Sequence, residues 1–121
     1  TVEGRAGVET KLVVEGAGLL PENIETELYR IAQEALNNSL KHSNASSVAV
    51  TLSTAGDPVW LRVQDNGRGF LAEEIADKGG LGLASMQERA QRLGGQVEVA
   101  SAPGEGVAVT VTIPLSGNPR K

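Results

Sequence analysis

The chain has 121 residues, 40% of them hydrophobic, and a formal net charge of −4, values typical of one globular domain with a single core. It contains no cysteine and one histidine, which excludes disulfides and thiolate metal sites and disfavours an all-protein zinc site. The negative net charge gives no sign of the basic surface that nucleic-acid binding requires. No apolar run approaches the roughly 20 residues that a membrane span needs. We expect one domain with a core over about residues 8–114 and a tail over 115–121.

The first half of the chain predicts a strand, a long helix and a hairpin. Residues 8–15 alternate and are rich in valine and leucine, which favours a strand. After Pro21, apolar residues recur at three- and four-residue steps from Ile24 to about His42, which predicts a helix. Residues 47–53 and 59–64 then read as two strands joined by a turn, so we expect an antiparallel hairpin.

The second half predicts a glycine loop, a second helix and two further strands. The loop covers residues 65–69, and the helix covers residues 83–93, where two glycines follow it. Strands are predicted over residues 96–100 and 107–113. This order of elements indicates an α/β (α+β) two-layer sandwich, with a mixed, mostly antiparallel sheet covered on one face by helices.

The long predicted helix carries a polar stripe beside its apolar face. At about 100° per residue, Glu34, Asn38 and Lys41 fall within an arc of roughly 60°. The apolar stripe lies about 100° away and consists of Ile24, Leu28, Ile31, Ala35 and Ser39. Asn38 offers an amide oxygen of the kind that binds Mg²⁺, Lys41 suits a phosphate, and Glu34 can hold a water or accept a proton. A solvated helix face would show the same spacing, although asparagine in the middle of a helix is a local cost that usually has a reason.

Four motifs, in order, resemble those of one family. Residues 29–43 read YRIAQEALNNSLKHS, which closely resembles the asparagine box of sensor histidine kinases. The first, second and third glycine boxes of that family are similar to residues 65–70 (DNGRGF), 80–89 (GLGLASMQER) and 101–106 (SAPGEG). The resemblance covers residues 19–114, and four such motifs at compatible spacing are highly specific. The chain is thereby identified as a catalytic ATP-binding domain (HATPase_c, GHKL superfamily) of a bacterial sensor histidine kinase.

The resemblance implies a Bergerat-type ATP-binding fold and transfer of the γ-phosphoryl of Mg-ATP to a histidine. That histidine lies on a separate dimerisation domain, in cis or in trans, and a response regulator is the further partner of the intact system. By analogy, Asp65 accepts a hydrogen bond from the adenine amino group, Asn38 holds Mg²⁺, and Lys41 lies beside the phosphates. Glu34, Asn38 and Lys41 form the implied catalytic group. The other implied nucleotide-binding residues are His42, Asn66, Gly67, Gly69, Gly80, Leu81, Gly82 and Leu83.

Two features qualify the resemblance. The third glycine box is often followed by threonine, whereas here Val107 follows it and removes a hydroxyl. His42 belongs to the Lys-His pair of the asparagine box, so the phosphoacceptor histidine must come from elsewhere, and this chain should bind ATP without phosphorylating itself.

The short segment over residues 70–79 and the Glu-Arg pair in the second helix favour the nitrate-sensor-like kinases paired with LuxR-type response regulators. Two alternatives stay open: an anti-sigma-factor-type serine kinase, and a non-catalytic nucleotide-gated interaction module. In each case we expect a cytoplasmic domain, on its own or as the cytosolic part of a membrane-anchored receptor, with no membrane contact of its own and no nucleic-acid partner.

Overall fold

A computed structural model describes residues 2–3, 9–16, 20–42, 46–67, 83–101, 104 and 106–115, and the structural account concerns those residues. The strands are β1 (Val2–Glu3), β2 (Glu9–Glu15), β3 (Ser47–Ser53), β4 (Val59–Asp65), β5 (Gln96–Ser101) and β6 (Val107–Ile113). The helices are α1 (Glu22–His42) and α4 (Leu83–Arg92). The strands form one six-stranded sheet in the order β1-β2-β3-β4-β6-β5.

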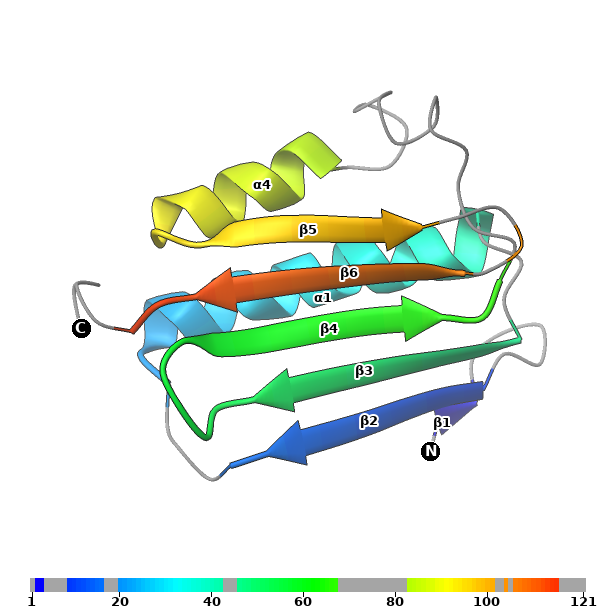
Figure 1. The fold of residues 1–121 in the computed structure, drawn as a ribbon, viewed down its shortest axis with the longest axis horizontal. Helices are drawn as coiled ribbons and strands as arrows, with labels where there is room; N and C mark the ends of the chain where they lie inside the picture. The colour runs from blue at the N-terminus through cyan, green and yellow to red at the C-terminus, as the bar shows by residue number, and fades with distance from the viewer. Residues whose placement is uncertain are drawn as a thin grey trace.

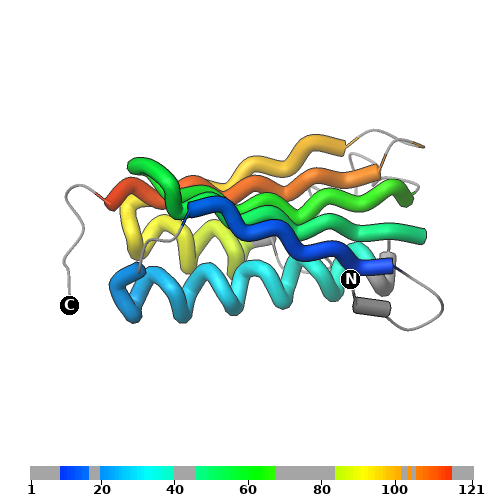
Figure 2. Tube along the Cα trace, turned by 90° about the horizontal axis from the view of Figure 1, so that it is seen from below, coloured from blue at the N-terminus to red at the C-terminus, as the bar shows by residue number. Residues whose placement is uncertain are grey.

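The sheet is mixed and mostly antiparallel, as predicted. Strands β2 and β3 pair in parallel, and every other neighbouring pair is antiparallel, including the β3–β4 hairpin. Both described helices lie on the same face of the sheet, which gives two layers (Figures 1 and 2). The residues of β4 and β6 that face the helices are buried. They are Val59, Leu61, Val63, Val107, Val109, Val111 and Ile113. The alternate residues of these strands, such as Arg62 and Thr110, lie on the outer face.

The start of α1 follows from Pro21 and two glutamates. The carbonyl oxygen of Pro21 accepts hydrogen bonds from the amides of Ile24 and Glu25, each at 3.0 Å, which closes the first turn. Glu22 and Glu25 lie in that turn, where a negative charge is favourable near the positive end of the helix dipole. The predicted apolar stripe of this helix is buried against the sheet, at 4% exposure or less throughout.

The end of α4 turns the chain back into β5. Gly94 has a φ of +76°, which is the left-handed conformation of a helix-terminating glycine. The amide of Gly95 donates to the carbonyl of Ala90 at 2.9 Å, and the amide of Gly94 donates to that of Gln91 at 3.0 Å. These two bonds form a Schellman motif, so the double glycine stops the helix as its sequence predicted.

An ion pair joins the two helices. The guanidinium of Arg89 on α4 lies 3.0 Å from the carboxylate of Glu27 on α1, and both side chains are partly buried. The side-chain amide of Gln87 also donates to the carbonyl of Val97 on β5 at 2.9 Å. These contacts fix α4 against α1 and the β5 edge of the sheet. The N-terminus of α4 and the C-terminal end of α1 lie toward the same end of the strands, the end at which β4 and β5 finish (Figure 1).

The predicted bounds differ from the observed ones by one or two residues. Helix α1 begins at Glu22, because the Pro21 cap precedes the first apolar position, and α4 ends at Arg92 with Leu93 in the turn. Strand β1 was not predicted, since two residues carry no alternation. Strand β4 extends to Asp65, which pairs with Val48. The predicted end of the first helix, at about His42, is confirmed. Val8, the first residue of the first predicted strand, and residues 68–82 lie outside the described residues.

The two described helices leave apolar side chains of β2 exposed. Leu12 and Val14 of β2 are 65% and 57% exposed, and Tyr29 of α1 is 64% exposed. These side chains line a groove of about 390 Å³ between α1 and the β2–β3 part of the sheet. Neither described helix has the combination of length and hydropathy that crossing a bilayer requires.

Candidate functional site

A buried carboxylate lies where β4 ends. Strand alternation places Val59, Leu61 and Val63 toward the helices, and the next position of the same parity is Asp65. Asp65 is 5% exposed, so a charged side chain terminates an apolar row. Burial of a carboxylate is costly unless hydrogen bonds satisfy it, so its partners define the site.

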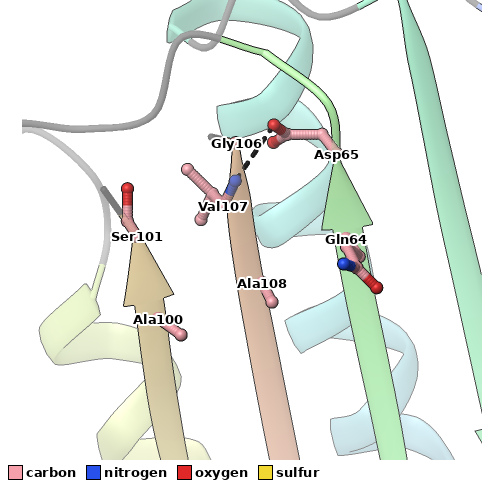
Figure 3. Close-up of a pocket in the computed structure, with 7 residues that line it drawn as sticks. All are labelled: Gln64, Asp65, Ala100, Ser101, Gly106, Val107 and Ala108. Carbon is pink, nitrogen blue, oxygen red and sulfur yellow. Dashed lines mark hydrogen bonds between the residues drawn. The ribbon is translucent and has the colours of Figure 1, made fainter. Parts of the chain in front are cut away.

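Among the residues that the structure describes, three donors from three segments hold the Asp65 carboxylate. The hydroxyl of Ser39 on α1 donates to Oδ2 at 2.6 Å. The backbone amides of Gly67 and Val107 donate to Oδ1 at 2.9 and 3.2 Å. Figure 3 shows the bond from Val107, at the start of β6, reaching across to Asp65 at the end of β4. Because Val107 contributes its backbone amide, the valine in place of threonine keeps this contact.

Gly106 allows β6 to approach β4 this closely. Its φ is +83°, and a Cβ on it would overlap the carbonyl oxygen of Asp65. The third glycine box therefore contains a glycine for two physical reasons, conformation and space. A pocket of about 350 Å³ opens at these strand ends (Figure 3). Its lining residues are Gln64, Asp65, Ala100, Ser101, Gly106, Val107 and Ala108.

The asparagine-box helix carries a buried asparagine next to the residue that contacts Asp65. Asn38 is 7% exposed and directly precedes Ser39, whose hydroxyl contacts Asp65. Glu34 lies one turn earlier and is partly buried, and Lys41 and His42 lie in the last turn of α1. The structure thus joins the asparagine box to the first glycine box through the bond from Ser39 to Asp65, two residues that are 26 positions apart in sequence.

The remaining predicted site residues fall into two groups. Leu83 is the first residue of α4, so the N-terminus of that helix lies within the second glycine box. Gly67 contacts Asp65 through its amide, as described above. The other members of the glycine boxes that we expect to bind nucleotide, Gly69, Gly80, Leu81 and Gly82, lie outside the described residues.

The side chain of Asn66 bonds to the segment that leads into β3. Its Oδ1 accepts from the amides of Ser46 and Ser47 at 3.0 and 2.9 Å, and its Nδ2 donates to the hydroxyl of Ser46 at 2.9 Å. These bonds join the end of β4 to the start of β3. The nucleotide contact that the motif resemblance implies for Asn66 stays a prediction.

Replacement of Asn66 with alanine is expected to lower the free energy of unfolding by about 2 kcal/mol, since three hydrogen bonds of about 0.5–1.5 kcal/mol each are lost. Urea denaturation measures this change. Asn66→Asp is the matched control, because it keeps the oxygen that accepts from both amides. An alanine variant that unfolds like the unchanged chain but no longer binds ADP would contradict the stabilising effect of these bonds.

Ser39 is the site residue that the sequence did not predict. Its spacing placed it correctly on the apolar stripe of α1, and it is 4% exposed. The available signal was a hydroxyl on an otherwise apolar stripe, but only the structure supplies the acceptor opposite it. The same holds for the Val107 amide, since a backbone donor leaves no trace in the residue type.

The fold and the site define a class of protein: a two-layer sandwich with a buried carboxylate at a strand end, facing a helix that carries a buried asparagine. Comparison with known families identifies the class. The chain belongs to the family of histidine kinase-, DNA gyrase B- and HSP90-like ATPases (HATPase_c), whose sequence model matches residues 23–117.

Similar proteins are sensor proteins. Over 97 residues the chain is 41% identical to the sensor protein VraS of Staphylococcus aureus (strain COL), an alignment that covers 80% of this chain and 28% of VraS. VraS of Staphylococcus haemolyticus gives the same identity and coverage. The chain thus spans little more than a quarter of the length of these relatives.

Solved structures share the fold. The histidine kinase domain of the Erythrobacter litoralis EL346 blue-light activated histidine kinase superposes with a TM-score of 0.75 at 26% identity, covering 93% of this chain and 54% of that one. The ATP binding domain of PrrB from Mycobacterium tuberculosis superposes with a TM-score of 0.72 at 22% identity, covering 93% of this chain and 82% of that one. The PrrB likeness concerns the fold alone.

Proposed function

We propose that this chain is the ATP-binding catalytic domain of a two-component sensor histidine kinase. It transfers the γ-phosphoryl of ATP to a histidine on a separate dimerisation domain, in cis or in trans, and the phosphoryl group then passes to a response regulator. The observation that carries the proposal is the bond from Ser39 to Asp65, because it joins the asparagine-box helix to the strand that ends in the first glycine box. Similarity to the VraS sensor proteins favours this function over a serine kinase or a non-catalytic module.

Nucleotide recognition begins at Asp65. A carboxylate is an acceptor only, and adenine presents an amino donor at the position where guanine presents a carbonyl oxygen. Donors on α1, β6 and the Gly67 loop hold the Asp65 carboxylate in one orientation, so its acceptor capacity is directed before the base arrives. Such preorganisation lowers the cost of binding.

In this proposal the phosphates of ATP lie near the C-terminal end of α1 and the N-terminal end of α4. The donor chemistry of α1 fits Mg²⁺, since Asn38 is buried beside the site and Mg²⁺ prefers a few protein oxygens together with phosphate oxygens and water. Bound there, Mg²⁺ would supply charge neutralisation of the phosphates. Lys41 adds a positive charge, and the N-terminus of α4, after Gly80 and Gly82, favours a phosphate.

Glu34 lies one helical turn before Asn38, where a carboxylate can order water or orient the attacking histidine. Catalysis in this proposal consists mostly of positioning and electrostatic stabilisation. The domain works on the cytoplasmic side, with no membrane contact of its own, and its response regulator is of the LuxR type.

Replacement of Asn38 with alanine is expected to weaken Mg-ATP binding about tenfold, the effect of losing one ligand interaction of about 1.4 kcal/mol. Chelation of Mg²⁺ should lower the ATP affinity of the unchanged chain and leave that of the variant almost unchanged. Calorimetric titration with and without Mg²⁺ measures both effects. Asn37→Ala is the control, because Asn37 is exposed on the same helix. Equal Mg²⁺ dependence in both variants would show that Asn38 is not the magnesium residue.

The phosphotransfer itself is tested with radiolabelled ATP. The chain alone should acquire no label, and addition of the histidine-bearing domain of its parent protein should give acid-labile label on that domain. Tight ATP binding without any transfer to that domain would favour a non-catalytic module instead.

A further inference from the structure

Ser39 is a polar residue in an apolar setting. It continues the stripe of Ile24, Leu28, Ile31 and Ala35, all buried, and its own exposure is 4%. Its hydroxyl lies 2.6 Å from Oδ2 of Asp65, within the range of a strong hydrogen bond to a carboxylate. A buried hydroxyl with a single well-placed acceptor orients that acceptor, which gives this serine an effect beyond packing.

The two oxygens of Asp65 are held by different parts of the fold. Oδ2 accepts from Ser39 on α1, while Oδ1 faces the backbone amides of Gly67 and Val107. Rotation of the carboxylate about its Cβ–Cγ bond would break all three bonds, because each donor has a fixed position. The amides belong to the backbone and cannot be removed by changing a side chain, so Ser39 is the one side-chain donor in this described set.

This arrangement bears on the choice of nucleobase. A carboxylate with both oxygens directed at a base edge can bind guanine in a bidentate manner, through the N1–H and the N2 amino group. At Asp65, Oδ1 is instead turned toward two amides, so the carboxylate is unsuited to bidentate capture. A base with one amino donor at that edge, as in adenine, fits this geometry better.

We propose that Ser39 is a positioning residue that sets base specificity, by holding the Asp65 carboxylate in the orientation that accepts one amino group and disfavours guanine. The inference rests on the proposed nucleotide-binding function and adds to it a residue outside the implied nucleotide contacts. Loss of the hydroxyl removes one of the bonds that resist rotation of the Asp65 carboxylate, so its orientation is held less firmly, ADP binding weakens and guanine is disfavoured less. We expect the ratio of ADP to GDP affinity to fall about tenfold or more in Ser39→Ala, the effect of losing one hydrogen bond to a charged group.

The test measures ADP and GDP affinities by calorimetry for the unchanged chain, Ser39→Ala and Ser39→Thr, with thermal melting to show that each variant is folded. Ser39→Thr retains the hydroxyl and should restore the ratio. Ser53→Ala is the matched control, because Ser53 is also buried, at 7% exposure, but pairs with Trp60 at the opposite end of β4 from Asp65. A merely structural serine would change both affinities by the same factor and leave their ratio unaltered.

The outcomes separate this inference from the function on which it rests. A lower ratio in Ser39→Ala, with the ratio kept in Ser53→Ala, supports the assignment. An unchanged ratio in a folded Ser39→Ala overturns it and leaves ATP binding intact, as does a folded Ser39→Thr that behaves like the alanine variant. Failure of the unchanged chain to bind ADP overturns both the proposed function and the inference.

Discussion

Replacing Gly106 with alanine is expected to lower the free energy of unfolding by about 3 kcal/mol, through left-handed backbone strain together with a steric overlap. The glycine has a φ of +83°, and an added Cβ would overlap the carbonyl oxygen of Asp65. Relief of that overlap requires β6 to move away from the end of β4, which lengthens the bond from the Val107 amide to the Asp65 carboxylate. We therefore expect weaker ADP binding as well as lower stability.

Gly104 provides a matched control for this prediction. Its φ is +82°, almost the same as that of Gly106, but a Cβ on it would meet no heavy atom within 4 Å. Gly104→Ala therefore has the conformational strain alone, about 1 kcal/mol. Urea denaturation of both variants isolates the steric part. Equal destabilisation of the two would contradict a close approach of Gly106 to Asp65.

The Asp65→Asn variant is expected to bind ADP about 100-fold more weakly, the loss that corresponds to about 3 kcal/mol for a hydrogen bond to a charged group. The amide has nearly the same shape as the carboxylate, so packing is preserved. One of its two polar atoms becomes a donor, however, and that atom must face either Ser39 or the backbone amides of Gly67 and Val107. The variant thus loses the oriented acceptor that adenine needs, together with some stability.

Calorimetric titration with ADP and thermal melting measure the two effects of Asp65→Asn separately. Asp57→Asn makes the same chemical change at an exposed position, in the turn between β3 and β4, and keeps an oxygen that can accept from the amide of Leu115. This control should bind ADP like the unchanged chain. A folded Asp65→Asn variant with undiminished ADP affinity would reject Asp65 as the base-recognition residue.

Local patterns were sufficient to predict most of the fold. The stripe from Ile24 to Ala35 and the alternation of Val59, Leu61 and Val63 specify which faces are buried, because side-chain periodicity is a property of each element alone. The Gly94–Gly95 pair marks the end of α4 for the same reason. The parallel pairing of β2 with β3 has no such local signature, since it depends on where the long helix returns the chain.

The site was predicted in part. Motif resemblance indicated Asp65 and Asn38, and the structure brings their elements together at one end of the sheet. The motif resemblance did not indicate Ser39, because the contact of Ser39 with Asp65 depends on the tertiary packing of α1 against β4. The bonds from Asn66 to Ser46 and Ser47 likewise join segments about 20 residues apart, which no spacing rule within one motif describes.

The central claim is that this chain binds adenine nucleotides at the end of β4, and a crystal structure of the chain with ADP and Mg²⁺ tests it most directly. The adenine amino nitrogen should lie about 3 Å from the Asp65 carboxylate, as in an ordinary hydrogen bond, with the phosphates near Asn38 and the N-terminus of α4. Nucleotide bound elsewhere, as in the groove between α1 and β2, or the absence of bound nucleotide at saturating ADP, would contradict the claim.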